Sequence, residues 1–218
     1  MSQNSKRTTI LLAGDLTPTP RLRAQIGGTR VIAADSGIRY ASALGLSPDL
    51  WVGDFDSATD DHHAEHGDVP TARFPAEKDK TDGEIAIEVA RSDGATEIIL
   101  AGAFGGERAD HAFLHLTTAM RAAESGLRVL LTSGTTEAVP LLPGDAEFDY
   151  PRGTVFSVLG FGDLAGLTLR GVKWPLDRRF VTFGSSLTIS NEVETRLTAS
   201  LEAGRAMLVA NLPVDAAA

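Results

Sequence analysis

A change in hydrophobic pattern near residue 134 is the feature that most restricts the folds open to this chain. Before that point, short apolar runs bounded by glycine or aspartate alternate with segments of helical periodicity. After it, short runs with apolar–polar alternation follow one another, and no helical pattern stands out. The first pattern predicts a parallel sheet with helices on its faces, and the second predicts a small all-β sandwich. We therefore expect an α/β domain over residues 1–134 and a β-sandwich domain over residues 135–218.

The periodicity also predicts individual elements. In the first part, strands are expected at Thr9–Ala13, Val31–Ala34, Leu50–Val52, Glu97–Ala101 and Arg128–Leu131, and helices at Ser36–Leu44, Thr81–Arg91 and Ala109–Glu124. Thr81 and Glu84 have the T-x-x-E spacing of a capping box, and Gly126 is expected to end the last helix. In the second part, strands are expected at Val155–Leu159, Leu167–Val172, Phe180–Phe183, Leu187–Ile189, Thr195–Leu201 and Ala206–Ala210. A hairpin turn at Ala203-Gly204-Arg205 is expected to join the last two strands.

The composition excludes several classes of function. The chain has 218 residues and a formal net charge of -9, which argues against a general nucleic-acid surface because phosphate backbones bind basic faces. It has no cysteine, so thiolate catalysis, disulfides and cysteine-ligated metal centres are excluded. No apolar run approaches the roughly 18 residues that a membrane span needs, and the first residues lack the apolar core of a secretory signal. We expect a cytoplasmic protein without a membrane or nucleic-acid partner.

Two carboxylates stand close together where the third strand is expected to end, in the segment Gly53-Asp54-Phe55-Asp56-Ser57. In extended backbone Asp54 and Asp56 point to the same side, and two charges about 5 Å apart repel by roughly 3 kcal/mol at an effective dielectric near 20. A bound cation offsets that repulsion, and ligands bind at the carboxyl ends of strands in open α/β sheets. The alternative is that Asp56 or Ser57 caps a helix running toward His66 while Asp54 is solvated.

Two further helix starts carry residues suited to phosphate chemistry. One of them carries Asp82. Its carboxylate either interacts favourably with the helix dipole or joins Asp54 and Asp56 in an oxygen-rich Mg²⁺ site shared with substrate phosphates. The glycine-rich segment Gly102–His111 places Arg108 at the other, which is typical of a phosphate cradle but also of an ordinary turn. This segment has neither the G-K-[ST] of a Walker A loop nor the G-x-G-x-x-G of a dinucleotide-binding turn.

The histidines do not predict a metal centre. His62, His63 and His66 lie in a polar segment and are expected on a solvated helix face. His111 and His115 have the i, i+4 spacing of a zinc-binding pair, but no glutamate occupies the H-E-x-x-H position, so we reject a zinc site.

Four segments of the first part form an ordered set: Ala34-Asp35-Ser36-Gly37, Gly53-Asp54-Phe55-Asp56-Ser57, Thr81-Asp82 with Glu84, and Gly102 through His111. The second part adds Gly171-Val172-Lys173-Trp174-Pro175-Leu176 and Ser190-Asn191. In this order they resemble the motifs of the thiamine pyrophosphokinase family, with G-D-F-D-S the most specific element. Two residues depart from the family pattern. Ser36 replaces the first glycine of its A-D-G-G segment, and Glu107 is an extra residue before Arg108 in its G-x-x-G-G-R-x-D-H segment.

The resemblance implies a homodimer whose subunits have an N-terminal α/β domain and a C-terminal β-sandwich. It also implies Mg²⁺-dependent transfer of the pyrophosphoryl group of ATP to the hydroxyl of thiamine, with release of AMP. The metal would be held by Asp54, Asp56 and Asp82, with Asp79 a weaker candidate. The nucleotide would contact Asp35, Ser36, Gly37, Thr81, Asp82 and Arg108. Asp110 would lie close to the transfer site, and Trp174, Ser190 and Asn191 would belong to a thiamine pocket formed where two subunits meet.

The chemistry of that reaction suits these residue types. Pyrophosphoryl transfer needs in-line positioning and neutralisation of the triphosphate, which metal-bound carboxylates and Arg108 supply. Trp174 is a credible platform for the cationic thiazolium ring of thiamine, although a core or interface tryptophan is the alternative. We hypothesise that Asp110 accepts the hydroxyl proton.

Two other functions stay open at this point. A phosphatase of the haloacid-dehalogenase type also carries a D-x-D motif after a strand, but Ala58 stands where that class usually has threonine or valine. A nucleotide-binding regulatory module could use the same acids without turnover. A metal-dependent phosphohydrolase and a non-catalytic regulatory module are therefore the alternatives to the kinase.

Overall fold

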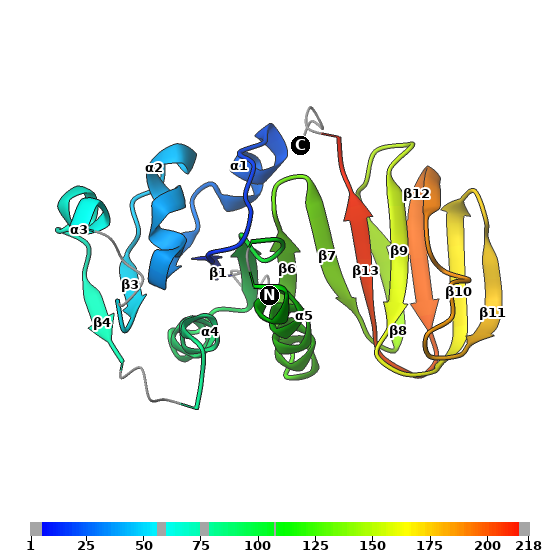
Figure 1. Ribbon diagram of the computed structural model, residues 1–218. Coiled ribbons are helices and arrows are strands. Elements are labelled where there is room, and N and C mark those ends of the chain that lie inside the picture. Colours follow the sequence, from blue (N-terminus) through cyan, green and yellow to red (C-terminus); the bar gives the residue numbers. More distant parts are fainter. Residues whose placement is uncertain (1–5, 56–59, 75–78, 107, 214–218) are drawn as a thin grey trace, which may run out of the picture.

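The computed structural model describes residues 6–55, 60–74, 79–106 and 108–213. Its elements in chain order are β1 (Arg7–Leu11), α1 (Pro20–Ile26), β2 (Arg30–Ala34), the 3₁₀ helix η1 (Asp35–Tyr40), α2 (Ala41–Leu44), β3 (Leu50–Gly53), α3 (Asp60–His66), β4 (Thr71–Arg73), α4 (Asp82–Ser92), β5 (Glu97–Ala101), α5 (Ala109–Glu124), β6 (Arg128–Thr132), β7 (Thr136–Leu141), β8 (Gly144–Phe148), β9 (Val155–Gly160), β10 (Leu164–Val172), β11 (Leu176–Val181), β12 (Asn191–Leu201) and β13 (Ala206–Asn211). The described strands follow the order β11-β10-β12-β9-β13-β7-β6-β5-β1-β2-β3-β4, and β8 pairs with β12. Figure 1 shows two lobes along this sheet, one flanked by helices and one made of strands.

The N-terminal lobe is built on the parallel strands β1 to β6. Helices α4 and α5 cover one face of the sheet with residues such as Ala86 and Ala119. Helices α1, η1 and α2 cover the other face with residues such as Leu22 and Ile38. Because both faces are covered, most of these strands are continuous apolar runs, as buried parallel strands usually are. The predicted α/β lobe is confirmed.

One local prediction in this lobe needs adjustment, and two short elements were not predicted. The helix expected over Ser36–Leu44 is divided into η1 and a single turn, α2, which ends at the left-handed Gly45. Helix α1 and strand β4 were not predicted, because each has at most seven residues and a weak apolar pattern. Helix α5 spans Ala109–Glu124 as predicted, and Gly126 follows it with a φ of 93°.

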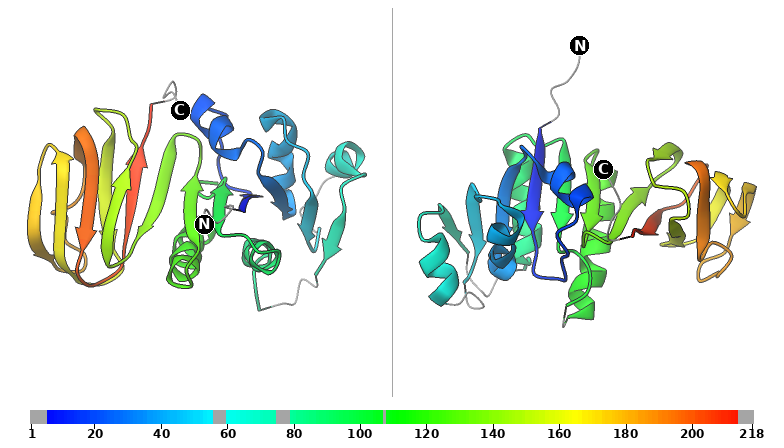
Figure 2. Two further views of the ribbon diagram at one scale, coloured as in Figure 1. Left: turned by 180° about the vertical axis from the view of Figure 1, so that it is seen from behind. Right: turned by 90° about the horizontal axis from the view of Figure 1, so that it is seen from above.

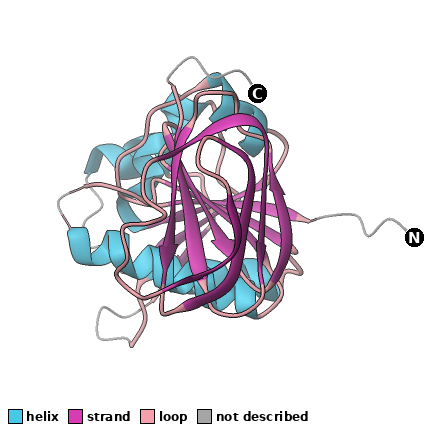
Figure 3. Ribbon diagram, turned by 90° about the vertical axis from the view of Figure 1, so that its right-hand side faces the viewer, coloured by secondary structure: helices cyan, strands magenta, loops and turns pink. Residues whose placement is uncertain are grey.

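The C-terminal lobe is antiparallel and encloses its own core. Strand β12 pairs with β9 near its start and with β8 and β10 along the rest of its length. Buried side chains such as Phe156, Leu169 and Leu197 fill the space between these strands. Figure 3 looks onto this lobe end-on and shows its strands curving in front of the helices. The all-β character predicted for this part of the chain is confirmed.

The hairpin predicted at Ala203-Gly204-Arg205 is wrong. β12 and β13 do not pair, because β9 lies between them and bonds to both. Leu187–Ile189 is also not a strand. Thr188 instead contacts β9 at one point: its carbonyl accepts from the Val158 N–H at 2.9 Å, and its hydroxyl donates to the Val158 carbonyl at 2.6 Å. Strands β7 and β8 were missed, since proline or charged residues interrupt their apolar pattern.

A buried polar junction joins the two lobes. Strand β6 pairs with β7, so the sheet crosses residue 134 without a break, as Figure 2 shows from behind. The domain boundary at that residue stays a prediction. Arg21 Nε on α1 donates to Glu137 Oε1 on β7 at 2.8 Å, and Gln25 Nε2 donates to the same oxygen at 2.8 Å. Burial, together with the charge of Glu137, raises the pKa of Tyr150 far above its ordinary value. Separating the lobes would break this buried ion pair, which is costly.

No helix in the described part of the chain is both long enough and apolar enough to cross a membrane.

Candidate active site

The carboxyl ends of β1, β2, β3 and β5 meet at one edge of the sheet. The segments that leave β1 and β5 are tied together at this edge. The Gly14 N–H donates to the Gly102 carbonyl at 2.9 Å, and the Asp15 N–H donates to the Phe104 carbonyl at 2.7 Å. Any side chain at Gly14 would collide with the carbonyl oxygens of Gly102 and Phe104. The glycine-rich turn after β5 is therefore positioned by the segment that follows β1.

Asp35, Ser36 and Gly37 begin η1 directly after β2. Asp35 has a left-handed φ of 46°, a conformation that is costly outside glycine and concentrates at functional sites. Gly37 is buried, and a side chain there would collide with the carbonyl oxygen of Leu11 at the end of β1. The close approach of these two backbones therefore requires glycine. Contacts of Asp35, Ser36 and Gly37 with a nucleotide stay predictions.

Asp54 directly follows β3 and is half-buried, and the next residue, Phe55, is buried with a left-handed φ of 67°. Asp56 and Ser57 lie outside the described residues, so the structure places neither the predicted metal ligand nor the alternative helix cap. The helix expected to run toward His66 is present as α3.

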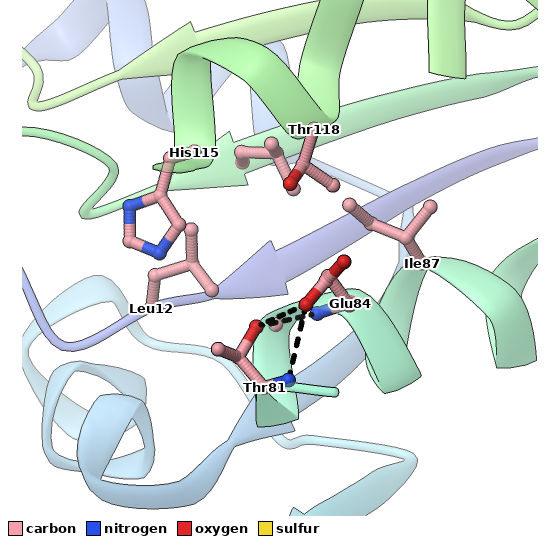
Figure 4. Close-up of a pocket in the computed structure, with 8 residues that line it drawn as sticks. Leu12, Thr81, Glu84, Ile87, His115 and Thr118 are labelled. Carbon is pink, nitrogen blue, oxygen red and sulfur yellow. Dashed lines mark hydrogen bonds between the residues drawn. The ribbon is translucent and has the colours of Figure 1, made fainter. Parts of the chain in front are cut away.

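Thr81 caps the N-terminus of α4, and Asp82 is the first residue of that helix. Figure 4 shows Thr81 at this position. The predicted capping box is confirmed: the Thr81 hydroxyl accepts from the Glu84 N–H at 3.4 Å, and the Thr81 N–H donates to the Glu84 carboxylate at 3.1 Å. Partial burial raises the pKa of Glu84, but hydrogen bonds from Thr81 and Arg121 outweigh this and keep that pKa below its ordinary value. Asp82 is half-buried in the first helical turn, and Asp79 is exposed ahead of the cap. The Thr81 hydroxyl is thus engaged in holding the helix start.

Arg108 and Asp110 lie at the N-terminus of α5 and bind each other. Arg108 Nε donates to Asp110 Oδ1 at 3.0 Å, and Arg108 Nη2 donates to Asp110 Oδ2 at 2.7 Å. Both side chains are 64% exposed. The hydrogen bond from Arg108 holds the pKa of Asp110 well below its usual range. In this arrangement Arg108 is directed at Asp110, and Asp110 is a weak base. Glu107, the extra residue of this turn, lies outside the described residues.

A small hollow between α4 and α5 is lined by the capping residues and His115 (Figure 4). His115 Nδ1 lies 3.0 Å from the Ala103 carbonyl, which can only accept, so Nδ1 carries a proton. Burial lowers the pKa of His115. A side chain at Gly83 would come within 3.1 Å of Leu12, so the first turn of α4 packs against the end of β1. These contacts join the starts of α4 and α5 at the same sheet edge.

Trp174, Ser190 and Asn191 come together in the C-terminal lobe. The Asn191 side chain accepts from the Trp174 N–H at 3.1 Å and donates to the Trp174 carbonyl at 2.9 Å. Asn191 is buried, whereas the Trp174 side chain is 55% exposed, with Lys173 Nζ 4.9 Å from the centre of its rings. Ser190 is exposed and has a left-handed φ of 59°. Asn191 therefore fixes the backbone of Trp174, and the residue before Asn191 is a serine with a strained backbone.

Comparison with known proteins decides the family. Residues 27–131 match the family model of the thiamin pyrophosphokinase catalytic domain, and residues 146–208 match that of the thiamin pyrophosphokinase vitamin B1 binding domain. The thiamine pyrophosphokinase of Bacillus subtilis (strain 168) is 30% identical over 183 residues, which cover 82% of this chain and 85% of the relative. The chain belongs to the thiamine pyrophosphokinase family.

Solved structures of thiamine pyrophosphokinases have the same fold. The crystal structure of the Bacillus subtilis protein matches with a TM-score of 0.85 at 26% identity, covering 95% of this chain and 100% of that one. The structure of the Geobacillus thermodenitrificans protein matches with a TM-score of 0.79 at 29% identity, covering 95% and 98% of the two chains. The resemblance inferred from the sequence motifs is thus confirmed.

The two thiamine pyrophosphokinase matches divide the candidate residues between the lobes. The catalytic-domain match contains the predicted metal, nucleotide and transfer residues, namely Asp35, Ser36, Gly37, Asp54, Asp56, Asp79, Thr81, Asp82, Arg108 and Asp110. The vitamin B1 binding match contains Trp174, Ser190 and Asn191. The roles of these individual residues stay predictions.

Arg39 and Tyr40 lie outside the thiamine pyrophosphokinase motifs but contact the segment that follows β1 at the same edge. Arg39 donates to the Ala13 carbonyl at 2.5 Å, and its guanidinium lies 4.8 Å from the centre of the Tyr40 ring. The Tyr40 hydroxyl donates to the Gly14 carbonyl at 2.5 Å. A signal for this region was present, because Gly14-Asp15 follows an apolar run just as Gly53-Asp54 does. That repeated strand–glycine–aspartate pattern points to one shared edge.

Within one chain the two groups of candidate residues are far apart. Trp174 follows β10 and Asp54 follows β3, and eight strands lie between these two in the described sheet. Figure 1 places β3 and β10 toward opposite ends of the molecule. One chain therefore does not bring Trp174 and Asp54 to the same substrate.

Proposed function

We propose that this chain is a thiamine diphosphokinase that transfers the pyrophosphoryl group of ATP to thiamine. The observation that carries the proposal is the match of both lobes to the two thiamine pyrophosphokinase domains. The hydroxyl oxygen of thiamine attacks the β-phosphorus of ATP, the bond from that phosphorus to the α-phosphate oxygen breaks, and AMP leaves. The products are thiamine diphosphate and AMP, and the hydroxyl proton passes to a base on the protein. The cysteine-free composition supports a cytoplasmic location, which stays a prediction.

The proposed cofactor is Mg²⁺. Asp54 and Asp82 offer carboxylate oxygens at the ends of β3 and the start of α4, and such oxygens are the ligands that Mg²⁺ prefers. The described residues contain no group of three or more acidic or histidine side chains gathered as a metal site. The donor set therefore needs phosphate oxygens of the substrate or Asp56, which lies outside the described residues. Bound Mg²⁺ would neutralise the charge of the triphosphate, and the carboxylates would fix where that charge lies.

Arg108 and Asp110 are proposed to exchange partners during the reaction. In the structure Arg108 neutralises Asp110, which keeps the carboxylate from accepting a proton. A triphosphate at the carboxyl edge offers Arg108 a more highly charged bidentate partner. Once Arg108 binds phosphate, the pKa of Asp110 returns toward its ordinary value, and the carboxylate becomes a stronger base for the thiamine hydroxyl. The same step would neutralise phosphate charge and free the base.

The proposed active enzyme is a homodimer. A thiamine pocket that uses Trp174 needs the pyrophosphoryl donor held by another subunit, because Asp54 of the same chain lies far along the sheet. The C-terminal lobe also exposes large apolar side chains, as interaction surfaces do. They are Val155, Leu159, Trp174, Phe180, Phe183, Leu187 and Ile189. In the proposed dimer a second copy covers these side chains and supplies Asp54 to the site that contains Trp174.

A product assay tests the function directly. We expect the protein, incubated with ATP, thiamine and Mg²⁺, to form AMP and thiamine diphosphate in equal amounts, and removal of Mg²⁺ by a chelator to stop both. Chromatographic separation of the nucleotides and the thiamine esters measures them. Release of inorganic phosphate without thiamine diphosphate would instead indicate a phosphohydrolase, and nucleotide binding without any product would indicate a regulatory module.

Mixing two inactive variants tests the shared pocket. Asp54→Asn and Trp174→Ala each damage every site of their own homodimers. If each site combines Asp54 of one subunit with Trp174 of the other, a mixed dimer keeps one intact site. Equal mixing after subunit exchange is then expected to restore about a quarter of wild-type activity, since half of the symmetric dimers become mixed. As the control, each variant is mixed with itself and treated identically. A monomer by light scattering, or a mixture no more active than its components, would contradict the dimeric site.

A further inference from the structure

Two backbone turns with unusual conformations lie side by side at the carboxyl edge. Asp35 after β2 and Phe55 after β3 have left-handed φ values of 46° and 67°. Such values are rare for a bulky side chain such as phenylalanine and persist only where the surroundings hold them. The turns also touch through the backbone, because a side chain at Gly53 would come within 3.3 Å of the Asp35 Cα. Something in the neighbourhood must therefore stabilise both turns together.

One buried side chain contacts both turns. Trp51 lies on β3, between Ala33 of β2 and Thr71 of β4, and is 1% exposed. Its indole Nε1–H donates to the Asp35 carbonyl at 2.9 Å. Its ring meets the Phe55 ring edge-to-face, with centroids 4.9 Å apart and planes at 87°. The indole thus holds one turn by a hydrogen bond and the other by an aromatic contact.

The Phe55 ring has a second contact. The Arg73 guanidinium at the end of β4 lies 5.3 Å from the Phe55 ring centre. Phe55 therefore contacts both Trp51 and Arg73, and these contacts restrain its ring and, with it, its backbone. Asp54, the residue before Phe55, leaves the sheet in a direction set by this arrangement. A change at Trp51 would reach Asp35 and Asp54 together, although the indole is buried beneath them.

We propose that Trp51 is a positioning residue for Asp35 and Asp54, the predicted nucleotide-binding and metal-binding residues that follow β2 and β3. It acts through the Asp35 carbonyl and the Phe55 ring, and it aligns Asp35 and Asp54 toward one shared ligand, a Mg²⁺-bound nucleoside triphosphate. The proposal rests on the function proposed above, because it assigns that ligand to this edge. Trp51 does not touch the reacting atoms, so its loss should weaken binding of the metal–nucleotide without affecting thiamine.

The test uses Trp51→Phe, which keeps an aromatic ring in the core and removes the N–H. Phe148→Leu is the matched control, because it also reduces a buried aromatic side chain but lies on β8, away from this edge. Calorimetric titration with Mg²⁺ and a non-hydrolysable ATP analogue, without thiamine, measures affinity. We expect Trp51→Phe to bind about tenfold more weakly, the lower range for losing a group that orients metal ligands. Phe148→Leu should bind like wild type even when it lowers the unfolding temperature as much as Trp51→Phe does.

A kinetic split separates positioning from general destabilisation. Trp51→Phe should raise the KM for Mg²⁺–ATP and leave the KM for thiamine unchanged, and Phe55→Leu, which removes the ring partner, should do the same. Wild-type affinity in Trp51→Phe, or equal weakening in Phe148→Leu, would overturn the role of Trp51. If wild type binds the analogue but forms no thiamine diphosphate, the proposed function fails while the affinity comparison still decides the role of Trp51. If wild type does not bind the analogue, both proposals fail.

Discussion

Replacing Asp54 with asparagine is expected to lower kcat for thiamine diphosphate formation by about 10²- to 10³-fold, the usual effect of removing one group that stabilises transition-state charge. The substitution keeps the size of the side chain and removes its charge. Asp54 is half-buried directly after β3, at the carboxyl ends of the parallel strands, where it can meet a phosphate-bound cation. We therefore expect the circular dichroism spectrum and the unfolding temperature to stay close to wild type while the Mg²⁺ dependence is lost.

The matched control for this substitution is Asp68→Asn. Asp68 is exposed and precedes β4, at the opposite edge of the sheet from the site, so the variant removes the same charge elsewhere. Its activity and its Mg²⁺ dependence should equal those of wild type. A folded Asp54→Asn protein that retained more than about a tenth of wild-type turnover would rule out Asp54 as a metal ligand.

Arg108→Gln and Asp110→Asn are each expected to lower kcat by about 10²-fold or more, and the double variant should be slower than either single variant. The reason is the exchange of partners proposed for this pair. Asp110 contributes as a base, a role worth about 10²- to 10⁴-fold. Removing Arg108 also releases Asp110 from its ion pair, so loss of the base still costs turnover in the Arg108→Gln background. Arg108→Gln should also raise the KM for ATP, because the triphosphate loses a cationic partner, whereas Asp110→Asn should act mainly on kcat.

Steady-state kinetics of the two single variants and the double variant form a cycle that measures this coupling. The control is Arg128→Gln, since Arg128 is an exposed arginine paired with Glu97 at the amino end of β6. It should leave both constants unchanged. A double variant no slower than the worse single variant would contradict the separate roles that Arg108 and Asp110 have after the exchange. Full turnover in Asp110→Asn would remove it from the reaction.

The local sequence predicts the α/β lobe well because local features determine its elements. The Thr81 and Glu84 capping box and the apolar face of α5 are readable within one helix, and both have the predicted positions. Buried parallel strands such as β5 are continuous apolar runs with clear ends. Short elements such as α1 carry too few residues for a period to show. The position of an element was therefore readable wherever its own residues carried the signal.

Strand pairing in the C-terminal lobe depends on contacts far apart in sequence. The turn before Ala206 has hairpin character, yet β9, which comes much earlier, pairs with both neighbouring strands. The alternation of Leu187–Ile189 suits a strand, but a single contact of Thr188 with Val158 replaces the ladder. The residues of neither segment indicate which strand it will pair with. Such pairings depend on which other strands of the lobe are available, and the propensity of a single strand does not determine them.

The candidate site shows the same limit. The motifs identified Asp54, Asp82 and Arg108 as neighbours in function, but they could not show that Arg108 binds Asp110 in the free protein. They also could not show that Asn191 holds the backbone of Trp174, because the two lie on different strands. Trp51 lies outside every motif, within the strand expected at Leu50–Val52. Side-chain partners of this kind are set by the tertiary fold.

The central place of β13 has a consequence for how the chain acquires its structure during synthesis. β13 is the last described strand, yet it pairs with β7 on one side and β9 on the other. A growing chain can complete the parallel strands through β6 early, but β7 and β9 must keep facing edges open until residues 206–211 have emerged. Open strand edges invite pairing with other chains. Until β13 is synthesised, the unpaired edges of β7 and β9 are therefore accessible to chaperones and to neighbouring chains.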